Sequence, residues 1–383
     1  MSDEAAAPEE QRAGWFELFF DLVFVVTVSV LAHGLHGDPS AEDFGTFLVL
    51  FFPAWWAWVN LMVTVNVFGS ASRLGQAVLL GAMPGLGLMA AAVPEGLGDR
   101  AWAYALGAAW TRLMLFIPWY WYAREDPAIP LWRPFSYGLA TAGVWAVSAA
   151  VPSPGRFVLW GVAIAAEVVI LAIRTDMQVA FYDRLHLEHL VERIGLFVVI
   201  VLGESVFTLV VALEEHFTAA SGTAALLGFV VVVELAMIFF LWGTRNAEHG
   251  LDRARARGAT QAVRDTVMYL PYVLISGVTA MAAALGTAVE EPHHDLPTGA
   301  RWALCGGILA FYTANATISL RFGDGLRNVL RWYVPCLVLT LGLLVPLSGV
   351  LPAWAAVGCA AAIVFALAKL ARLTRTRFRF RTP

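Results

Sequence analysis

Ionisable residues stand inside segments of this chain that are otherwise apolar enough to cross a membrane. The clearest case is WFELFFDLVFVVTVSVLAHGL at residues 15–35, where Glu17 and Asp21 are one helical turn apart. An ionised group at the centre of a bilayer costs about 2.5–3.5 kcal/mol on insertion scales, so such residues face the interior of a helix bundle and mark ion or proton paths by default. The predicted pathway residues are Glu17, Asp21, Arg112, Glu167 and Glu204.

Acidic residues outnumber basic residues in these apolar segments. With Glu234 included, five acids accompany the single base Arg112. The excess negative charge requires a bound cation or proton, which predicts a polar path near the middle of the membrane. We expect Asp21 and Glu204 to share one site there with Arg112 as their counter-charge. The alternative is structural: Arg112 pairs with one or two acids, and the others are neutral and hydrogen-bond between helices.

A second polar cluster, HLEHLVER at residues 186–193, precedes another apolar segment. On a helix it places His189, Glu192 and Arg193 near one another, with His189 and Arg193 at i, i+4. Imidazole and carboxylate groups can relay protons or bind a transition metal. The simpler interpretation is a cap with salt bridges at the membrane interface, and we expect no metal and no cofactor.

The composition is that of an integral membrane protein. The chain has 383 residues, of which 59% are hydrophobic and only 14% charged, and its mean hydropathy is +0.70. A P-loop ATPase is excluded because Lys369 is the only lysine and follows Ala368, so no Walker A motif exists. Cys305, Cys336 and Cys359 stand singly in late apolar segments and imply neither disulfides nor a redox pair.

Apolar runs long enough for a bilayer of about 30 Å predict an all-α polytopic fold with about twelve transmembrane helices. No soluble domain is inserted between them, so the function belongs in the bilayer or at its faces. The predicted spans are near 15–34, 44–68, 74–93, 101–122, 135–151, 157–173, 194–213, 222–242, 266–289, 300–321, 329–347 and 351–371.

The arginines predict the orientation. If both termini are cytoplasmic, nearly all arginines and the basic tail fall inside, and only Arg100, Arg156 and Arg301 fall outside. This is the asymmetry that the positive-inside rule describes. The tail RLTRTRFRFRTP directly follows the last span, so we expect it to contact anionic lipids rather than nucleic acid.

An internal repeat is suggested by the first and seventh spans. Residues 21–24 read DLVF and residues 204–207 read ESVF, each an acid followed by the same Val-Phe pair. The two spans are six positions apart in the order of spans, which predicts two parallel six-helix repeats, residues 1–190 and residues 191–383 with the basic tail.

Glycine and proline stand in corresponding spans of the two predicted repeats. Those of the third span are Gly81, Pro84, Gly85 and Gly87, and those of the ninth are Pro271 and Gly277. Paired broken helices of this kind line many transporter sites, although both residues are also common in ordinary transmembrane helices. Trp55, Trp56 and Trp58 could stack on a ligand, but packing inside the bundle is the simpler role.

ELFFDLVFV (residues 17–25), WWAWVN (55–60) and ERIGLFVVIVLGES (192–205) together resemble the bacterial low temperature requirement protein A family, over essentially the whole chain. The resemblance implies a bacterial plasma membrane protein and suggests a role in cold growth, but no chemistry. A weaker similarity is to TMEM175-like potassium channels, which also have two six-helix repeats; their Phe-Ser-Asp motif is here Phe20-Asp21, without the serine.

These observations predict a multi-pass protein that moves a proton, a cation or another small solute through a polar site in the membrane. The alternative is a membrane-embedded enzyme or stress sensor, metal-dependent through His189 and Glu192, and a third possibility is a structural membrane protein without transport. The expected partners are the bilayer, the small ion or solute and a second copy of the chain.

Overall fold

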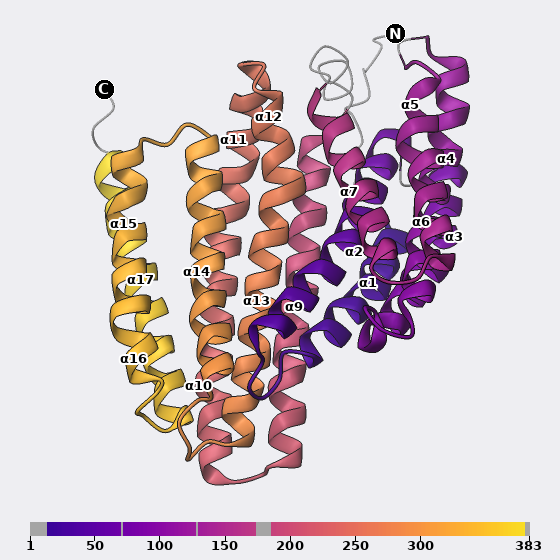
Figure 1. Ribbon diagram of the computed structural model, residues 1–383. Coiled ribbons are helices and arrows are strands. Elements are labelled where there is room, and N and C mark those ends of the chain that lie inside the picture. The colour runs from indigo at the N-terminus through magenta and orange to yellow at the C-terminus, as the bar shows by residue number, and fades with distance from the viewer. Residues whose placement is uncertain (1–13, 70–71, 128, 174–184, 380–383) are drawn as a thin grey trace.

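The computed structural model describes residues 14–69, 72–127, 129–173 and 185–379. Within these ranges the chain is helical and forms one long bundle (Figure 1). Its elements are α1 (Trp15–His33), α2 (Ala41–Phe68), α3 (Arg73–Ala92), η1 (Val93–Glu95), α4 (Ala101–Glu125), α5 (Trp132–Pro134), η2 (Phe135–Ala140), α6 (Thr141–Ala150), α7 (Gly155–Ile173), α9 (Leu187–Glu215), α10 (Ala219–Ile238), η3 (Phe239–Gly243), α11 (Thr244–Ala256), α12 (Thr260–Arg264), η4 (Asp265–Tyr269), α13 (Leu270–Glu290), α14 (Thr298–Arg321), α15 (Leu326–Leu339), η5 (Thr340–Leu344), α16 (Val345–Leu347) and α17 (Ala353–Arg379).

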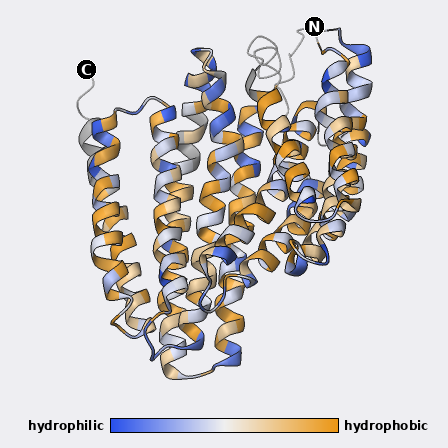
Figure 2. Cartoon of the chain, in the orientation of Figure 1, coloured by the Kyte–Doolittle hydropathy of each residue, from blue (hydrophilic) through white to orange (hydrophobic). Residues whose placement is uncertain are grey.

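Nine helical segments in the described ranges are long and apolar enough to cross a membrane. Figure 2 shows the apolar residues along the helices and polar residues gathered toward their two ends. The all-α membrane fold is therefore as predicted. The three remaining predicted spans coincide with α4, with the run from α5 through η2 to α6, and with α7; the count of twelve stays a prediction, as do the division into two repeats at residue 190 and the lipid contacts of the tail.

Two helices form the centre of the bundle. Every residue of α2 from Ala54 to Asn66 is buried, and so is every residue of α13 from Leu274 to Val289. Around them, α1, α3 and α4 pack near α2, while α9, α10, α14 and α17 pack against α13. Because α1 also packs against α9 and α13, the amino-terminal helix joins the two groups.

Two helix pairs cross at glycines. In the pair α3–α4, a Cβ on Gly107 would lie 2.6 Å from the carbonyl oxygen of Gly85, and in the pair α13–α14, a Cβ on Gly277 would lie 2.8 Å from the carbonyl oxygen of Gly307. Neither α3 nor α13 is broken at these positions, and α3 continues through Pro84. The prediction of interrupted helices is thus wrong for Pro84, Gly85 and Gly277, because the glycines there allow close packing of backbones rather than ending the helices. At Pro271 the ninth span does change form, since the π-helical η4 ends at Tyr269 and α13 begins at Leu270.

Candidate functional site

A buried cluster of charged side chains lies where α1 meets α9. The Arg193 guanidinium reaches both acids of α1: Nη1 lies 2.9 Å from Glu17 Oε1, and Nη2 lies 2.7 Å from Asp21 Oδ1. All three side chains are at most 1% exposed. Glu17 and Asp21 are one turn apart on α1, so a single arginine on the facing helix can contact both.

Polar neighbours hold each member of this cluster. The His189 Nε2 lies 3.3 Å from Glu17 Oε2, and the Gly14 N–H donates to the same oxygen at 2.8 Å. On α2, the Trp58 indole N–H donates to Asp21 Oδ1 at 2.8 Å, and Asn66 Nδ2 lies 3.0 Å from His189 Nδ1. Three helices therefore converge on one ionic cluster, which we call the α1–α9 cluster: Glu17, Asp21, Trp58, Asn66, His189 and Arg193.

The formal charges of the α1–α9 cluster do not balance. Two carboxylates, those of Glu17 and Asp21, face the single guanidinium of Arg193, beside the His189 imidazole. Asp21 Oδ2 has no hydrogen-bond partner among the described residues, although Asp21 is fully buried. An unsatisfied carboxylate oxygen in such a place is costly, and it is a position where a proton or cation would be stabilised.

Arg112 belongs to a separate ion pair between α4 and α7. Its Nε and Nη2 contact the two carboxylate oxygens of Glu167 at 2.9 and 3.2 Å, and both side chains are 1% exposed. The guanidinium also lies over the Trp145 ring, 5.3 Å from its centroid. A bidentate pair of this kind is a strong and geometrically fixed interaction.

Glu204 contacts neither arginine. Ser29 Oγ donates to Glu204 Oε1 at 2.5 Å, and Glu204 is only half-buried. Ser29 follows Asp21 by eight residues on α1, about 12 Å along the helix. The expectation that Asp21 and Glu204 share a site with Arg112 is therefore corrected: the register of α1 on α9 places Arg193, not Glu204, beside Asp21.

Aromatic rings fill the space between these two levels of α1. Phe24 lies 5.4 Å from Phe197 and 6.1 Å from Trp58, measured between ring centroids, and Phe197 lies 4.6 Å from Trp58. Phe24, Phe197 and Trp58 are fully buried. The polar groups along α1 and α9 are thus separated by an apolar layer, an arrangement that controls water entry in channels.

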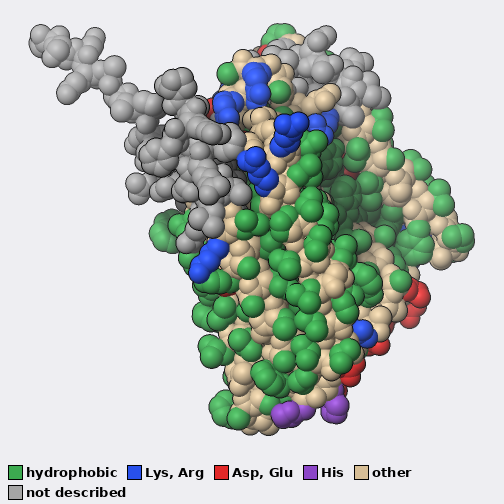
Figure 3. Space-filling model, turned by 90° about the vertical axis from the view of Figure 1, so that its left-hand side faces the viewer, with side chains coloured by type: hydrophobic (Ala, Val, Ile, Leu, Met, Phe, Trp, Pro, Cys, Tyr) green, Lys and Arg blue, Asp and Glu red, His purple; other side chains and the backbone are tan. Residues whose placement is uncertain are grey.

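The far end of α1 carries histidines. His33 and His36 lie with ring centroids 5.8 Å apart, and His36 Nδ1 is 3.6 Å from Glu290 Oε1. Burial lowers the pKa of His36, and the nearby Glu290 carboxylate opposes that shift. Figure 3 shows histidines and acids near this end of the molecule, whereas arginines gather toward the opposite end.

The sequence-predicted cluster at residues 186–193 divides in two. His189 and Arg193 point into the bundle, whereas His186 and Glu192 are exposed. Glu192 therefore lies away from His189, and no group of three or more His, Cys, Asp and Glu residues in the described ranges could hold a metal ion.

The sequence did not predict that Glu17 and Asp21 form one site with the cluster at residues 186–193. It also did not predict that Trp58 and Asn66 belong to that site. A signal was available: acids stand at i, i+4 on α1 (Glu17 and Asp21), and basic residues stand at i, i+4 on α9 (His189 and Arg193). Facing helices with such complementary pairs can match them turn by turn. Nothing in the local sequence singles out Asn66.

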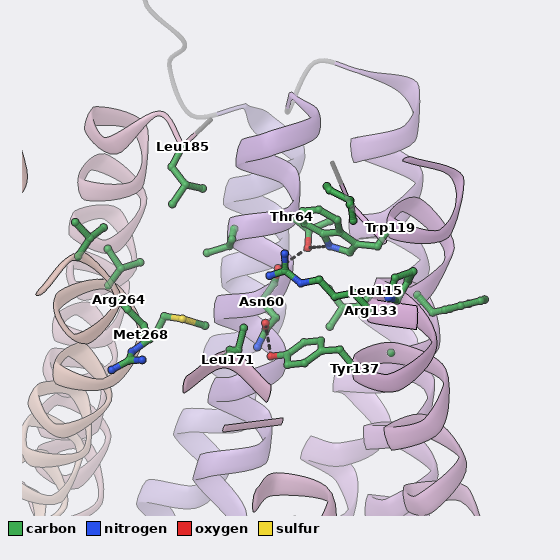
Figure 4. A pocket seen from close by; sticks show the side chains of 17 residues that line it. Asn60, Thr64, Leu115, Trp119, Arg133, Tyr137, Leu171, Leu185, Arg264 and Met268 are labelled. Carbon is green, nitrogen blue, oxygen red and sulfur yellow. Dashed lines mark hydrogen bonds between the residues drawn. The ribbon is translucent and has the colours of Figure 1, made fainter. Parts of the chain in front are cut away.

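A cavity opens between the two groups of helices at the arginine-rich end. The space free of protein atoms there, open solvent included, is about 880 Å³, and its lining comes from α2, α4, α5, η2, α7, α12 and η4 together with Ile129 and Leu185. Figure 4 shows two hydrogen bonds on its wall, from Tyr137 Oη to Asn60 Oδ1 at 2.7 Å and from Trp119 Nε1 to Thr64 Oγ1 at 3.0 Å. Leu185, one of the lining residues, lies two residues before the start of α9, the helix that carries His189.

Known proteins resemble this chain over most of its length. The family described as Bacterial low temperature requirement A protein (LtrA) matches residues 12–369. An uncharacterized protein of Rhizobium meliloti (strain 1021) is 26% identical over 303 residues, which cover 74% of this chain and 71% of that protein. No solved structure matches the chain.

Proposed function

The chain belongs to the bacterial low temperature requirement A protein family, and we propose that it moves protons or small cations across the membrane along the interface of α1 and α9. The observation that carries this proposal is the α1–α9 cluster itself. It combines two buried acids, one arginine and one histidine, so it can change its charge by one without losing its ion pairs.

The placement of the cluster supports a transport role. Glu17, Asp21 and Arg193 lie inside helices that are long and apolar enough to span a membrane, where ionisable residues mark ion and proton paths. Farther along the same interface come the Phe24–Phe197 layer, the Ser29–Glu204 hydrogen bond and the His36–Glu290 pair. Polar groups on both sides of an aromatic layer are suited to a gated path for ions or protons.

The finer topology is part of this proposal. Twelve spans in two parallel six-helix repeats, a bacterial plasma membrane location and cytoplasmic termini agree with the gathering of arginines toward one end (Figure 3). The similar glycine crossings of α3–α4 and α13–α14 also support a repeat. In this arrangement Arg112 and Glu167 form a fixed ion pair beside the path, and the predicted pathway residues Glu17, Asp21 and Glu204 lie along it.

The test is a flux assay with purified protein in liposomes that contain a pH-sensitive dye. A proton gradient or a potassium diffusion potential supplies the driving force. We expect the wild type to conduct protons or exchange them for a cation. The flux through Asp21→Asn should be lower by a factor of about ten or more, because an intramembrane carboxylate is the group that carries the charge. An amide can still accept from Trp58 and Arg193, so Asp21→Asn should remain folded.

Glu188→Gln is the matched control. Glu188 is exposed on the same helix as His189 and one residue away, so its neutralisation should leave the flux unchanged. If folded wild-type protein moves no more protons, sodium or potassium than empty liposomes, or if Asp21→Asn retains full flux, the proposed function is wrong.

A further inference from the structure

Protons and metal cations need different things from a buried site. A proton bonds to one oxygen atom, whereas a metal cation needs several oxygen ligands that replace its hydration shell. The acceptor atoms that remain free around Asp21 therefore decide which of the two the α1–α9 cluster can hold.

Asp21 offers a single free acceptor atom. Its Oδ1 already accepts from the Trp58 indole N–H at 2.8 Å and from Arg193 Nη2 at 2.7 Å. Its Oδ2 has no hydrogen-bond partner among the described residues, and the side chain is fully buried. One oxygen of this carboxylate is thus free to take a ligand.

The neighbouring carboxylate of Glu17 is turned toward N–H groups. Its Oε2 accepts from the Gly14 N–H at 2.8 Å and lies 3.3 Å from His189 Nε2. Its Oε1 lies 2.9 Å from Arg193 Nη1, in an ion pair whose angle is not that of a hydrogen bond. A metal cation placed at Oε1 would therefore meet the guanidinium.

The His189 imidazole has no lone pair left for a cation. Asn66 is oriented by the backbone of His186, because its Oδ1 accepts from the His186 N–H at 3.0 Å and its Nδ2 donates to the His186 carbonyl at 3.1 Å. The same Nδ2 lies 3.0 Å from His189 Nδ1, and an amide nitrogen can only donate. Nδ1 is therefore the acceptor of the ring, and Nε2 carries the N–H that faces Glu17.

Arg193 opposes a metal cation by its charge. Its side chain is fully buried, and its terminal nitrogens contact both acids of α1. A metal ion beside Asp21 Oδ2 would lie close to this guanidinium, and like charges repel more strongly in a buried site than in water. A proton on Oδ2 becomes part of the carboxyl group instead, and it leaves the hydrogen bond from Arg193 to Oδ1 in place.

We infer that the α1–α9 cluster binds protons and excludes metal cations, with Asp21 Oδ2 as the proton-binding atom and Arg193 as the specificity-determining residue. If the cluster is the transport site of the proposed function, on which this assignment rests, the transported ion is the proton. One O–H bond forms at Oδ2 with a proton from water and later breaks to return that proton to water; no other bond changes. Trp58 and Arg193 hold Oδ1 throughout.

The test is infrared difference spectroscopy of the full chain in phosphatidylcholine membranes during titration with acid. Protonation of Asp21 creates a carboxyl C=O stretching band, which should be lost in Asp21→Asn and kept in Glu188→Gln. The titration is repeated with N-methylglucamine replaced by sodium, potassium or magnesium at constant ionic strength. We expect the midpoint pH of the band to stay unchanged, whereas a competing cation would lower it by about one unit for each tenfold rise above its Kd.

Arginine variants test what excludes the cations. Arg193→Gln should make the midpoint depend on sodium or potassium, because the buried positive charge is gone. Arg193→Lys keeps a positive charge, so its midpoint should stay independent of both. Thermal unfolding shows which variants are folded, and the wild-type titrations decide between proton and cation even where Arg193→Gln does not fold.

Two results would overturn proton binding at this site: a wild-type midpoint that falls as sodium, potassium or magnesium rises, or no Asp21-dependent band over the pH range in which the protein is folded. A folded Arg193→Gln with a cation-independent midpoint would contradict the role of Arg193. The titration needs no flux. A protein without flux can therefore still show cation-independent protonation of Asp21, and a protein that moves sodium or potassium with cation competition keeps the proposed transport but not the proton specificity.

Discussion

The helix pairs α3–α4 and α13–α14 cross in the same way but carry different side chains beyond the crossing. In the first pair, Gly107 faces the Gly85 carbonyl and Met89; in the second, Gly307 faces the Gly277 carbonyl and Met281. In both pairs the methionine follows its glycine by four residues on the partner helix. At the glycines and the methionine the two crossings match, and the side chains farther along the second helix are where the pairs differ.

That difference appears five residues after each glycine of the second helix. In α4 this residue is Arg112, paired with Glu167; in α14 it is Tyr312, whose hydroxyl has no hydrogen-bond partner among the described residues. Both side chains are buried. One packing arrangement thus holds a full ion pair in one place and a lone hydroxyl in the other, which shows that the buried charge is not needed to make the crossing.

The largest expected effect is that of Arg112→Ala. Truncation leaves Glu167 buried and unpaired, and breaking one side of a buried pair costs about 3–5 kcal/mol. Reversible unfolding in mixed micelles should show this loss, or the protein should fail to accumulate.

The double variant Arg112→Met with Glu167→Gln tests whether the charge itself is required. Removing both charges leaves no orphaned ion, so most of the lost stability should return, and the non-additivity measures the pairing. A double variant as unstable as Arg112→Ala would contradict the view that the pair is dispensable for packing.

A smaller loss is expected where the backbones touch. Gly107→Ala and Gly307→Ala each place a Cβ against a carbonyl and a methionine of the facing helix, and overpacking of this kind costs about 1–3 kcal/mol. Gly307→Ala should cost more, because it meets Met281 Cβ, whereas Gly107→Ala meets the more flexible Met89 Cγ, each at 2.7 Å.

Gly306→Ala is the control for Gly307→Ala, since a Cβ on Gly306 meets nothing within 4 Å. It should be neutral or stabilise the helix by up to about 1 kcal/mol. If the unfolding free energies of Gly306→Ala and Gly307→Ala are equal, the close crossing is not what limits that position.

The sequence predicted the features of this molecule that depend on composition. It did not predict which side chains pair between helices, because that depends on the register of one helix along another. Apolar runs predicted the membrane helices, and the cost of buried charge singled out Glu17, Asp21, Arg112 and Glu167 as interior residues. The partners could not be predicted, because a shift of α1 along α9 by three turns would exchange Arg193 for Glu204 beside Asp21. That register is set by packing across the whole interface, including Phe24 on Phe197 and Trp58.

The same limit applies to the glycines. Pro84, Gly85 and Gly277 were visible as irregular positions, and the sequence alone could not distinguish a broken helix from a close crossing. Glycine is suited to a broken helix and to a close crossing alike. Only the distance to Gly107 or Gly307 on the facing helix distinguishes the two cases.

The smallest expected effect is that of Tyr312→Phe. A buried hydroxyl without a hydrogen-bond partner has lost its hydration and gained no bond in exchange. Removing it should therefore change the unfolding free energy by no more than about 1 kcal/mol, in the stabilising direction. The ring contacts with Phe311 and Trp332, at 5.7 and 6.3 Å between centroids, remain in the variant. Tyr104→Phe is the matched comparison, because the Tyr104 hydroxyl donates to the Leu50 carbonyl and the variant loses this buried hydrogen bond. It should cost about 0.5–1.5 kcal/mol. A loss above about 2 kcal/mol for Tyr312→Phe would mean that this hydroxyl does bond a partner, and the second crossing would then carry polar chemistry of its own.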